Sequence, residues 1–254
     1  MHDALTPFEK VLRSLGVRVV KKGESRKYLR LPQDFAEEHC TIYRRIEPFT
    51  MTRPPRVYAL IEAVKYVVAQ NIEGDFVECG VWKGGSVMAM ALTLQMLQAE
   101  RDIHLFDTFE GMSAPTEEDW NAKEGAAEKF ARTRREDGGA DWCRSEIDEV
   151  RRNVLSTGYD EDRLRFVRGR VEDTLPAQAP ERIALLRLDT DFYESTRHEL
   201  IHLYPRLVSG GVLILDDYGH WQGARQAVDE FIDEHRPGIL LNRVDFAGRI
   251  AIKP

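Results

Sequence analysis

The sequence predicts an α/β protein built on one mostly parallel sheet with helices on both faces. Short apolar runs rich in β-favouring residues alternate with stretches of helical periodicity, which is the pattern of a parallel sheet with crossover helices. Most acidic residues and glycines that could carry chemistry follow the ends of those runs, where ligands bind in such sheets. With 254 residues, 43% of them hydrophobic, the chain is long enough to bury a large core.

Seven runs are expected to form strands, and helices are expected between them. The last two runs are joined through Ala247-Gly248, too tightly for a parallel crossover, so they should form an antiparallel hairpin. The first helix follows Pro54-Pro55, and its apolar residues recur at helical spacing from Val57 to Val68. The other helices are expected at Gly85–Gln98, Glu194–Leu207 and Gln222–His235. The expected strands are Asp75–Val81, Ile103–Phe109, Leu164–Gly169, Ile183–Asp191, Gly210–Tyr218, Ile239–Val244 and Arg249–Ile252.

Two segments fall outside this alternation. Residues from about 112 to 160 are charged and helix-prone, and they are too many for a plain connection, so they are expected to form a helical insertion. The insertion is either a solvated surface hairpin or a lid over the substrate. Residues 1–52 are expected to form an N-terminal lid or substrate segment, and residues 53–254 the main domain.

Composition excludes several classes of function. The net charge of −7 argues against a nucleic-acid partner, which usually needs a basic surplus. The three cysteines lie far apart without metal-ligand spacing, so neither a disulfide framework nor a structural zinc site is expected. No apolar run has the length of a membrane span, and the N-terminus lacks the apolar core of a signal peptide. These features predict a cytoplasmic protein with no membrane partner.

A glycine-rich loop, Gly80 to Ser86, follows the first predicted strand and opens the next helix. Glycines allow a ligand to approach the backbone closely, and a helix N-terminus favours an anionic group. The spacing GxxxGG differs from the dinucleotide fingerprint GxGxxG, and bulky Trp82 and Lys83 lie inside it. A ligand with one carboxylate is therefore favoured over a pyrophosphate. Glu78, just before the loop, is alternatively a structural acceptor for backbone N–H groups.

Acidic residues end three further predicted strands. Asp107 could accept both hydroxyls of a ribose, or could cap an ordinary turn. Asp189 and Asp191 end one strand, and Asp216-Asp217 ends a neighbouring one. Clustered carboxylates disfavour one another's ionisation unless a cation intervenes, and an all-oxygen cluster suits Mg²⁺ or Ca²⁺. The alternative is that these aspartates cap helices and strand ends in solvent.

Four motifs together resemble the macrocin O-methyltransferase (TylF-type) family: VECGVWKGGS, FDTFEGM, LRLDTDFYEST and LILDDY. The resemblance runs from about Thr50 to the C-terminus. It implies a Rossmann-like class I methyltransferase fold, with a seven-stranded sheet, a C-terminal antiparallel hairpin and helical lid elements. It also implies a homodimer that uses S-adenosylmethionine and Mg²⁺ to methylate a hydroxyl of a sugar or glycosylated natural product, as in antibiotic tailoring.

The same resemblance implies roles for individual residues. Asp191 matches the general base, and Asp189, Asp216 and Asp217 match the metal ligands, although Asp189 and Asp191 could exchange roles. Thr190 stands where relatives often carry Gly. The residues matched to cofactor binding are Thr50, Met51, Thr52, Glu78, Gly80, Trp82, Gly84, Ser86, Asp107, Thr108, Phe109, Gly169, Val171, Glu172 and Asp189.

Three alternatives stay open at this point. One is a small-molecule methyltransferase that needs no metal. Another is a Mg²⁺-dependent phosphohydrolase, whose acidic motifs resemble Asp189-Thr190-Asp191 and Asp216-Asp217; here Tyr193 stands where those enzymes need Thr or Val. An NAD oxidoreductase is disfavoured by the spacing of the glycine-rich loop.

Overall fold

The computed structural model describes residues 31–122, 125–136 and 139–254, of which Phe35–Pro254 form one compact unit. Its sheet has seven strands in the order β3-β2-β1-β4-β5-β7-β6, and the first five along the chain are parallel. The predicted fold class is thereby confirmed. The strands are β1 (Asp75–Cys79), β2 (Ile103–Asp107), β3 (Leu164–Arg168), β4 (Ile183–Leu188), β5 (Leu207–Leu215), β6 (Asn242–Arg243) and β7 (Arg249–Ile252).

Strand order reverses between β1 and β4, at the centre of the sheet. The chain runs outward from β1 through β2 to β3, returns to β4 beside β1, and then runs outward to β5 on the other side. The loops that leave β1 and β4 therefore diverge to opposite faces and leave a crevice at the strands' carboxyl ends. The predicted hairpin is present, because β7 pairs antiparallel with both β5 and β6.

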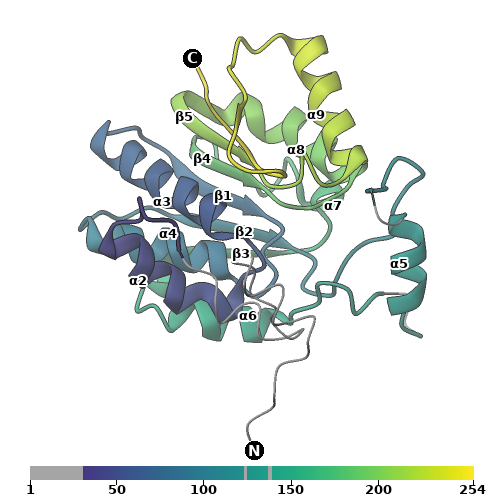
Figure 1. Ribbon diagram of the computed structural model, residues 1–254, viewed down its shortest axis with the longest axis horizontal. Helices are drawn as coiled ribbons and strands as arrows, with labels where there is room; N and C mark the ends of the chain where they lie inside the picture. The colour runs from purple at the N-terminus through teal and green to yellow at the C-terminus, as the bar shows by residue number, and fades with distance from the viewer. Residues whose placement is uncertain (1–30, 123–124, 137–138) are drawn as a thin grey trace, which may run out of the picture. The chain divides into compact units, whose positions relative to one another are not determined.

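Helices cover both faces of the sheet (Figure 1). One layer holds α2, α3, α4 and α6, and the other holds α7, α8 and α9, with contacts within each layer. Helix α4 is buried along most of its length, as expected for a helix between the sheet and other helices. The bounds are α2 (Glu37–Ile46), α3 (Pro54–Ala69), α4 (Gly85–Met96), α6 (Ile147–Leu155), α7 (Val171–Thr174), α8 (Tyr193–Leu203) and α9 (Gln222–His235).

Several predicted elements are shorter in the structure. The strands that were extended to Asp191 and Tyr218 end at Leu188 and Leu215, because the chain leaves the sheet there to form the loops at its carboxyl edge. The helix predicted to reach Leu207 ends at Leu203. A 3₁₀ turn containing Pro205 follows it, since proline has no N–H to continue a helix.

Only part of the predicted insertion projects from the sheet. Helix α5 (Ala126–Thr133) belongs to a small apolar cluster in which Ala126 and Trp142 pack with Phe192 and Trp221. Helix α6 instead packs against α4, where Val150 and Val154 face Gly84, so it belongs to the layer that covers the sheet.

The structure describes only part of the predicted N-terminal segment, residues 1–52. Helix α2 packs against α3 and α4 inside the compact unit, whereas residues 1–30 lie outside the described residues. In the part of the chain that the structure describes, no helix is long and apolar enough to cross a membrane.

We predict that Gly80→Ala destabilises the fold by about 2–4 kcal/mol. Gly80 has φ of 82°, and an added Cβ would lie 2.1 Å from the carbonyl oxygen of Asp189. Urea unfolding measures the change. Gly125→Ala is the matched control, since no atom of the described residues other than its chain neighbours lies within 4 Å of its added Cβ, and it should cost less than about 1 kcal/mol. Equal costs for the two variants would contradict the close approach of the β1 and β4 loops.

Candidate active site

The loop after β1 is held by Asp107 at the end of β2. Its Oδ2 accepts hydrogen bonds from the backbone N–H groups of Val81 (2.7 Å) and Trp82 (3.1 Å), and its Oδ1 accepts one from Phe109 (2.7 Å). Burial raises the pKa of this carboxyl, and these three donors oppose the rise. Asp107 thus caps two turns, which was the structural alternative, while its side chain also lines the crevice.

The glycines of the loop serve the packing of chain segments. A Cβ on Gly85 would lie 2.5 Å from the carbonyl oxygen of Phe49, and one on Gly84 would lie 2.9 Å from Val154. Gly85 therefore lets the segment before α3 cross the start of α4, and Gly84 lets α6 do the same. This explains the GxxxGG spacing without a pyrophosphate.

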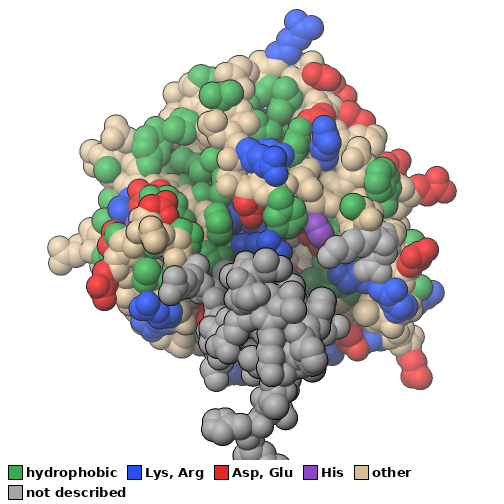
Figure 2. Space-filling model, viewed as in Figure 1, with side chains coloured by type: hydrophobic (Ala, Val, Ile, Leu, Met, Phe, Trp, Pro, Cys, Tyr) green, Lys and Arg blue, Asp and Glu red, His purple; other side chains and the backbone are tan. Residues whose placement is uncertain are grey.

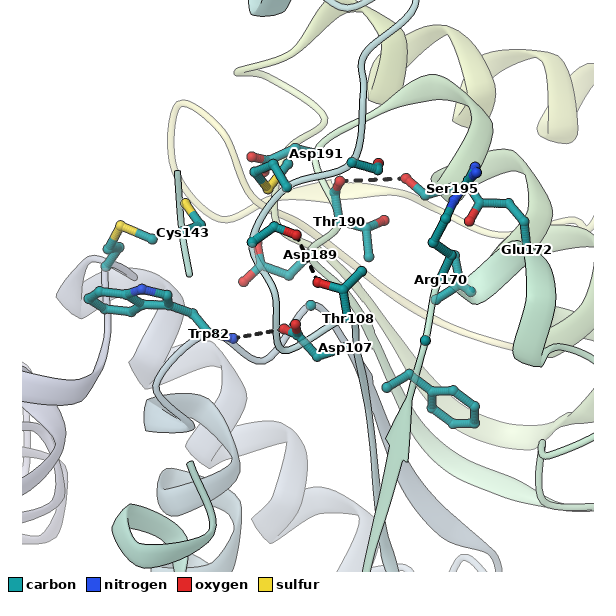
Figure 3. Close-up of a pocket in the computed structure, with 18 residues that line it drawn as sticks. Trp82, Asp107, Thr108, Cys143, Arg170, Glu172, Asp189, Thr190, Asp191 and Ser195 are labelled. Atoms are coloured by element: carbon teal, nitrogen blue, oxygen red, sulfur yellow. Dashed lines mark hydrogen bonds and ion pairs between the residues drawn. The ribbon is translucent and has the colours of Figure 1, made fainter. Parts of the chain in front are cut away.

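Two adjoining pockets lie at the carboxyl ends of the strands. Both are lined by Met51, Trp82, Cys143, Asp189 and Asp191. Figure 3 shows side chains that follow different strands around the first pocket: Trp82 and Asp107 on one side, Asp189 to Asp191 above them, and Glu172 opposite. The first pocket is also lined by Gly80, Thr108, Gly169 and Val171. The second is also lined by Thr50, Thr52, Glu78, Ser86, Asp216 and Asp217.

Two predicted cofactor residues do not line either pocket. Gly84 packs against α6, as described above. Phe109 is buried with its ring 6.4 Å from that of Phe166. The structure therefore brings together all of the other residues that the sequence assigned to cofactor binding.

Three carboxylates converge where the two pockets meet. Single oxygen atoms of Asp189, Asp191 and Asp217 lie within 4.8 Å of one another. Burial, together with the charge of its neighbours, raises the pKa of Asp191 to about 7 and raises those of Asp189 and Asp217. The Oδ2 atom of Asp217 is buried and has no hydrogen-bond partner among the described residues. A buried, unpartnered carboxylate oxygen beside two more carboxylates is suited to a divalent cation.

Asp216 is not part of this cluster. Its Oδ1 accepts a hydrogen bond from Nη2 of Arg187 (2.6 Å), and its Oδ2 pairs with Arg56. Both oxygens are thus engaged by arginines. The cluster therefore contains Asp191, which was expected as the base, and does not contain Asp216, which was expected as a metal ligand.

Arg187 is the residue at the site that the sequence analysis missed. Its side chain, only 1% exposed, donates from Nη1 to Glu78 and to Asp189 Oδ2 (2.7 Å), and from Nη2 to Asp216 and Thr52 Oγ1 (3.1 Å). An arginine inside the buried run Ile183–Leu188 must be paired, because an unpaired charge is too costly to bury. The rule that a buried charge needs partners could therefore have pointed to an ion network around Arg187 from the sequence alone.

Glu78 is held by the same arginine. Burial raises the pKa of this carboxyl to about 7 even though the Arg187 guanidinium favours its charged form. The expectation that Glu78 accepts backbone N–H groups is replaced by this ion pair across β1 and β4.

Some of the backbone strain lies at the cleft. Of the seven non-glycine residues with positive φ in the described part of the chain, Trp82 (46°), Cys143 (52°) and Asp191 (71°) line it. Such conformations cost free energy and persist where the surrounding structure requires them, as at functional sites.

The sheet order and a cleft at the switch point define a class I methyltransferase. The macrocin-O-methyltransferase (TylF) family model matches residues 11–251, and the chain belongs to that family. It is therefore an S-adenosylmethionine-dependent O-methyltransferase, and the phosphohydrolase alternative is wrong.

Several similar proteins are also named as O-methyltransferases. The chain is 34% identical over 200 residues, 78% of its length and 73% of the relative's, to the 8-demethyl-8-(2,3-dimethoxy-alpha-L-rhamnosyl)-tetracenomycin-C 4'-O-methyltransferase of Streptomyces olivaceus. It is 33% identical to the mycinamicin III 3''-O-methyltransferase of Micromonospora griseorubida, covering 73% of the chain and 71% of the relative. The solved O-methyltransferase NovP superposes with a TM-score of 0.71 at 29% identity, over 81% of this chain and 82% of that one.

We predict that Arg187→Met destabilises the protein by about 3–5 kcal/mol, because three carboxylates lose a buried partner. Arg165→Met is the control; Arg165 pairs with Asp102 at the surface, and its loss should cost about 0–1 kcal/mol. Urea unfolding measures both. Adding Glu78→Gln to Arg187→Met should recover part of the loss. If the double variant recovers nothing and the single variant costs no more than the control, the ion network does not stabilise the fold.

Proposed function

We propose that this enzyme transfers a methyl group from S-adenosylmethionine to a hydroxyl of a sugar or glycosylated natural product, with Mg²⁺ bound beside the acceptor. The observation that carries the proposal is the position of the Asp189–Asp191–Asp217 cluster, at the junction of two pockets. The names of the relatives, which methylate glycosylated tetracenomycin and mycinamicin, support the acceptor class. The resemblance also supports a homodimer, and three free cysteines suit a reducing cytoplasm.

The first pocket is suited to the adenosine part of the cofactor. Asp107 faces the pocket from β2 and, after its three backbone bonds, still has one lone pair on Oδ1 for a ribose hydroxyl. Gly169, Val171 and Glu172 lie farther along the same pocket, on the side proposed for adenine. The methionine end then points to the second pocket, where Thr50, Met51 and Thr52 were expected to hold it.

Mg²⁺ fits the acidic cluster. The donors are all oxygens, and the unpartnered oxygen of Asp217 lacks any other ligand among the described residues. We propose that Asp189 and Asp217 would hold the ion, with Asp191 beside them as the proton acceptor. When bound, Mg²⁺ would orient neighbouring oxygens of the acceptor and lower the pKa of the reacting hydroxyl.

The reaction then needs a proton acceptor and an aligned oxygen. Asp191 accepts the proton of the acceptor hydroxyl as its oxygen forms a bond to the methyl carbon. The carbon–sulfur bond breaks at the same time, and S-adenosylhomocysteine leaves. A positioned base of this kind contributes about 10²–10⁴-fold to the rate.

We expect Asp107→Ala to weaken S-adenosylhomocysteine binding by about 10- to 100-fold, since it removes a charged acceptor of a ribose hydroxyl and the cap of the β1 loop. Calorimetry measures the affinity. Glu172→Ala, farther along the same pocket, is the comparison and should weaken binding less. Unchanged affinity in Asp107→Ala would restrict this residue to the role of a turn cap.

We expect EDTA to abolish methyl transfer and leave S-adenosylhomocysteine affinity largely intact. Asp217→Asn should raise the Mg²⁺ concentration needed for half-maximal activity at least tenfold, because it removes a ligand charge. Asp216→Asn should instead lower the unfolding midpoint and leave the Mg²⁺ requirement near that of the wild type, because Asp216 faces Arg56 and Arg187.

Activity assays at varied Mg²⁺ separate the alternatives. Full activity after EDTA would favour a metal-independent methyltransferase. If Asp216→Asn raises the Mg²⁺ requirement as much as Asp217→Asn does, the ligand set proposed here is wrong. Asp191→Asn should lower turnover even at saturating Mg²⁺.

A further inference from the structure

An outer groove continues from the second pocket, in which the proposed function places the acceptor sugar. It shares His220, Trp221 and Phe246 with that pocket and extends to Arg53, Trp120 and Arg225. We propose that this outer groove binds a planar aromatic ring that carries a negative charge and is attached to the methylated sugar. The proposal rests on the proposed function, because it places the sugar in the neighbouring pocket.

One wall of the outer groove is aromatic and starts at the acidic cluster. The His220 ring lies edge-on to Trp221 (centroids 5.3 Å apart) and to Phe246 (6.1 Å). The backbone N–H groups of His220 and Trp221 both donate to the carbonyl oxygen of Asp217, at 2.8 and 3.0 Å. A ligand in the groove is therefore held at a fixed place relative to Asp217.

The loop that carries Phe246 is fixed against this wall. A Cβ on Gly219 would lie 1.9 Å from the Phe246 carbonyl oxygen, so only glycine allows the two loops to meet. The N–H of Gly219 donates to the carbonyl oxygen of Ala247 (2.9 Å). The wall thus exists before a ligand binds, which lowers the entropic cost of binding.

Trp120 also lines the groove, and its side chain is exposed although its backbone is anchored. Its side chain is 51% exposed, while its carbonyl oxygen accepts a hydrogen bond from Gln222 (2.9 Å). The preceding Asp119 is buried and accepts from the N–H of Tyr193 (2.8 Å). Among the seven large hydrophobic side chains that are exposed in the described residues, Trp120, Phe246 and Met51 all line this groove or the adjoining pockets. This concentration favours a binding surface over scattered exposure.

The charge of the groove favours an anion. Its lining includes Arg53 and Arg225 and, among the described residues, no Asp or Glu, in a chain whose net charge is −7. Arg225 pairs with Asp229 on its own helix (3.5 Å), so the positive charge of the groove comes mainly from Arg53. The Arg53 guanidinium lies 4.9 Å from the centre of the Phe246 ring and has no carboxylate within ion-pair distance in the described part of the chain. Figure 2 shows hydrophobic, basic and histidine side chains next to one another near the centre of one face. Aromatic and cationic groups together bind planar anions well.

Paired fluorescent probes test the proposal. The anion 1-anilinonaphthalene-8-sulfonate and the uncharged N-phenyl-1-naphthylamine share a ring system and differ in the sulfonate. Arg53→Gln should weaken binding of the sulfonate about fivefold and leave the uncharged probe unchanged. Trp120→Ala should weaken both about fivefold. Arg182→Gln and Leu240→Ala, exposed elsewhere, are the controls and should change neither.

Competition then identifies the source of the charged ring. Displacement of the sulfonate probe by 4-carboxyphenyl glucoside, a glycoside with an acidic aromatic aglycone, supports the proposal. Displacement by thymidine 5'-diphosphate alone, whose charge is on the phosphates and not on the ring, overturns it. The proposal is overturned if neither displaces the probe, or if Arg53→Gln affects both probes equally. S-adenosylhomocysteine calorimetry on the same variants should show wild-type affinity. A wild-type protein that binds no S-adenosylhomocysteine would refute the proposed function, independently of the probe results.

Discussion

The buried guanidinium of Arg187 is the interaction on which the site depends. Carboxylates from β1, β4 and the end of β5 meet at one edge of the sheet, where burial and mutual repulsion oppose their ionisation. Arg187 donates to Glu78, Asp189 and Asp216 and so compensates the charges that face the interior. Arg56 adds a second cation on Asp216. Burying such a network is costly, and breaking it costs more than keeping it.

This compensation divides the acidic residues into two groups. Asp216 and Glu78 face arginines and hold the strands together, whereas Asp191 and Asp217 face the cleft without a guanidinium. Asp189 belongs to both groups, because Arg187 holds its Oδ2 while its side chain joins the cluster. A site with every carboxylate paired would have no charge left for a cation, and one with none paired would not fold at neutral pH.

The sequence predicted the sheet and the cleft better than the partners within the cleft. Strand β7 and helix α9 were predicted to the residue, because turn and helix-end signals bound them. Alternation along a strand says that Asp216 and Asp217 point to opposite sides, but not which side faces Arg56 or Arg187. Asp191 has a positive φ, so its side chain does not follow the alternation of sides along the strand. An aspartate in a sequence does not by itself predict this backbone conformation. Arg187 was hidden in an apolar run, and its partners Glu78, Thr52 and Asp216 lie far away in sequence.

The loop between β5 and α9 carries a residue of the acidic cluster at its first end and residues of the outer groove at its second. Asp217 lies two residues after the end of strand β5, and four residues later Trp221 caps the start of α9 beside the outer groove. The hydrogen bonds from His220 and Trp221 to the carbonyl oxygen of Asp217 make this connection a rigid turn. On the strand side the ion network fixes Asp216, while on the outer side His220 is exposed and Trp221 is buried with Trp142 and Phe192. Because Asp217 lies at the junction, displacement of the groove wall would move a carboxylate of the acidic cluster, so acceptor binding and the geometry of the reaction are mechanically linked.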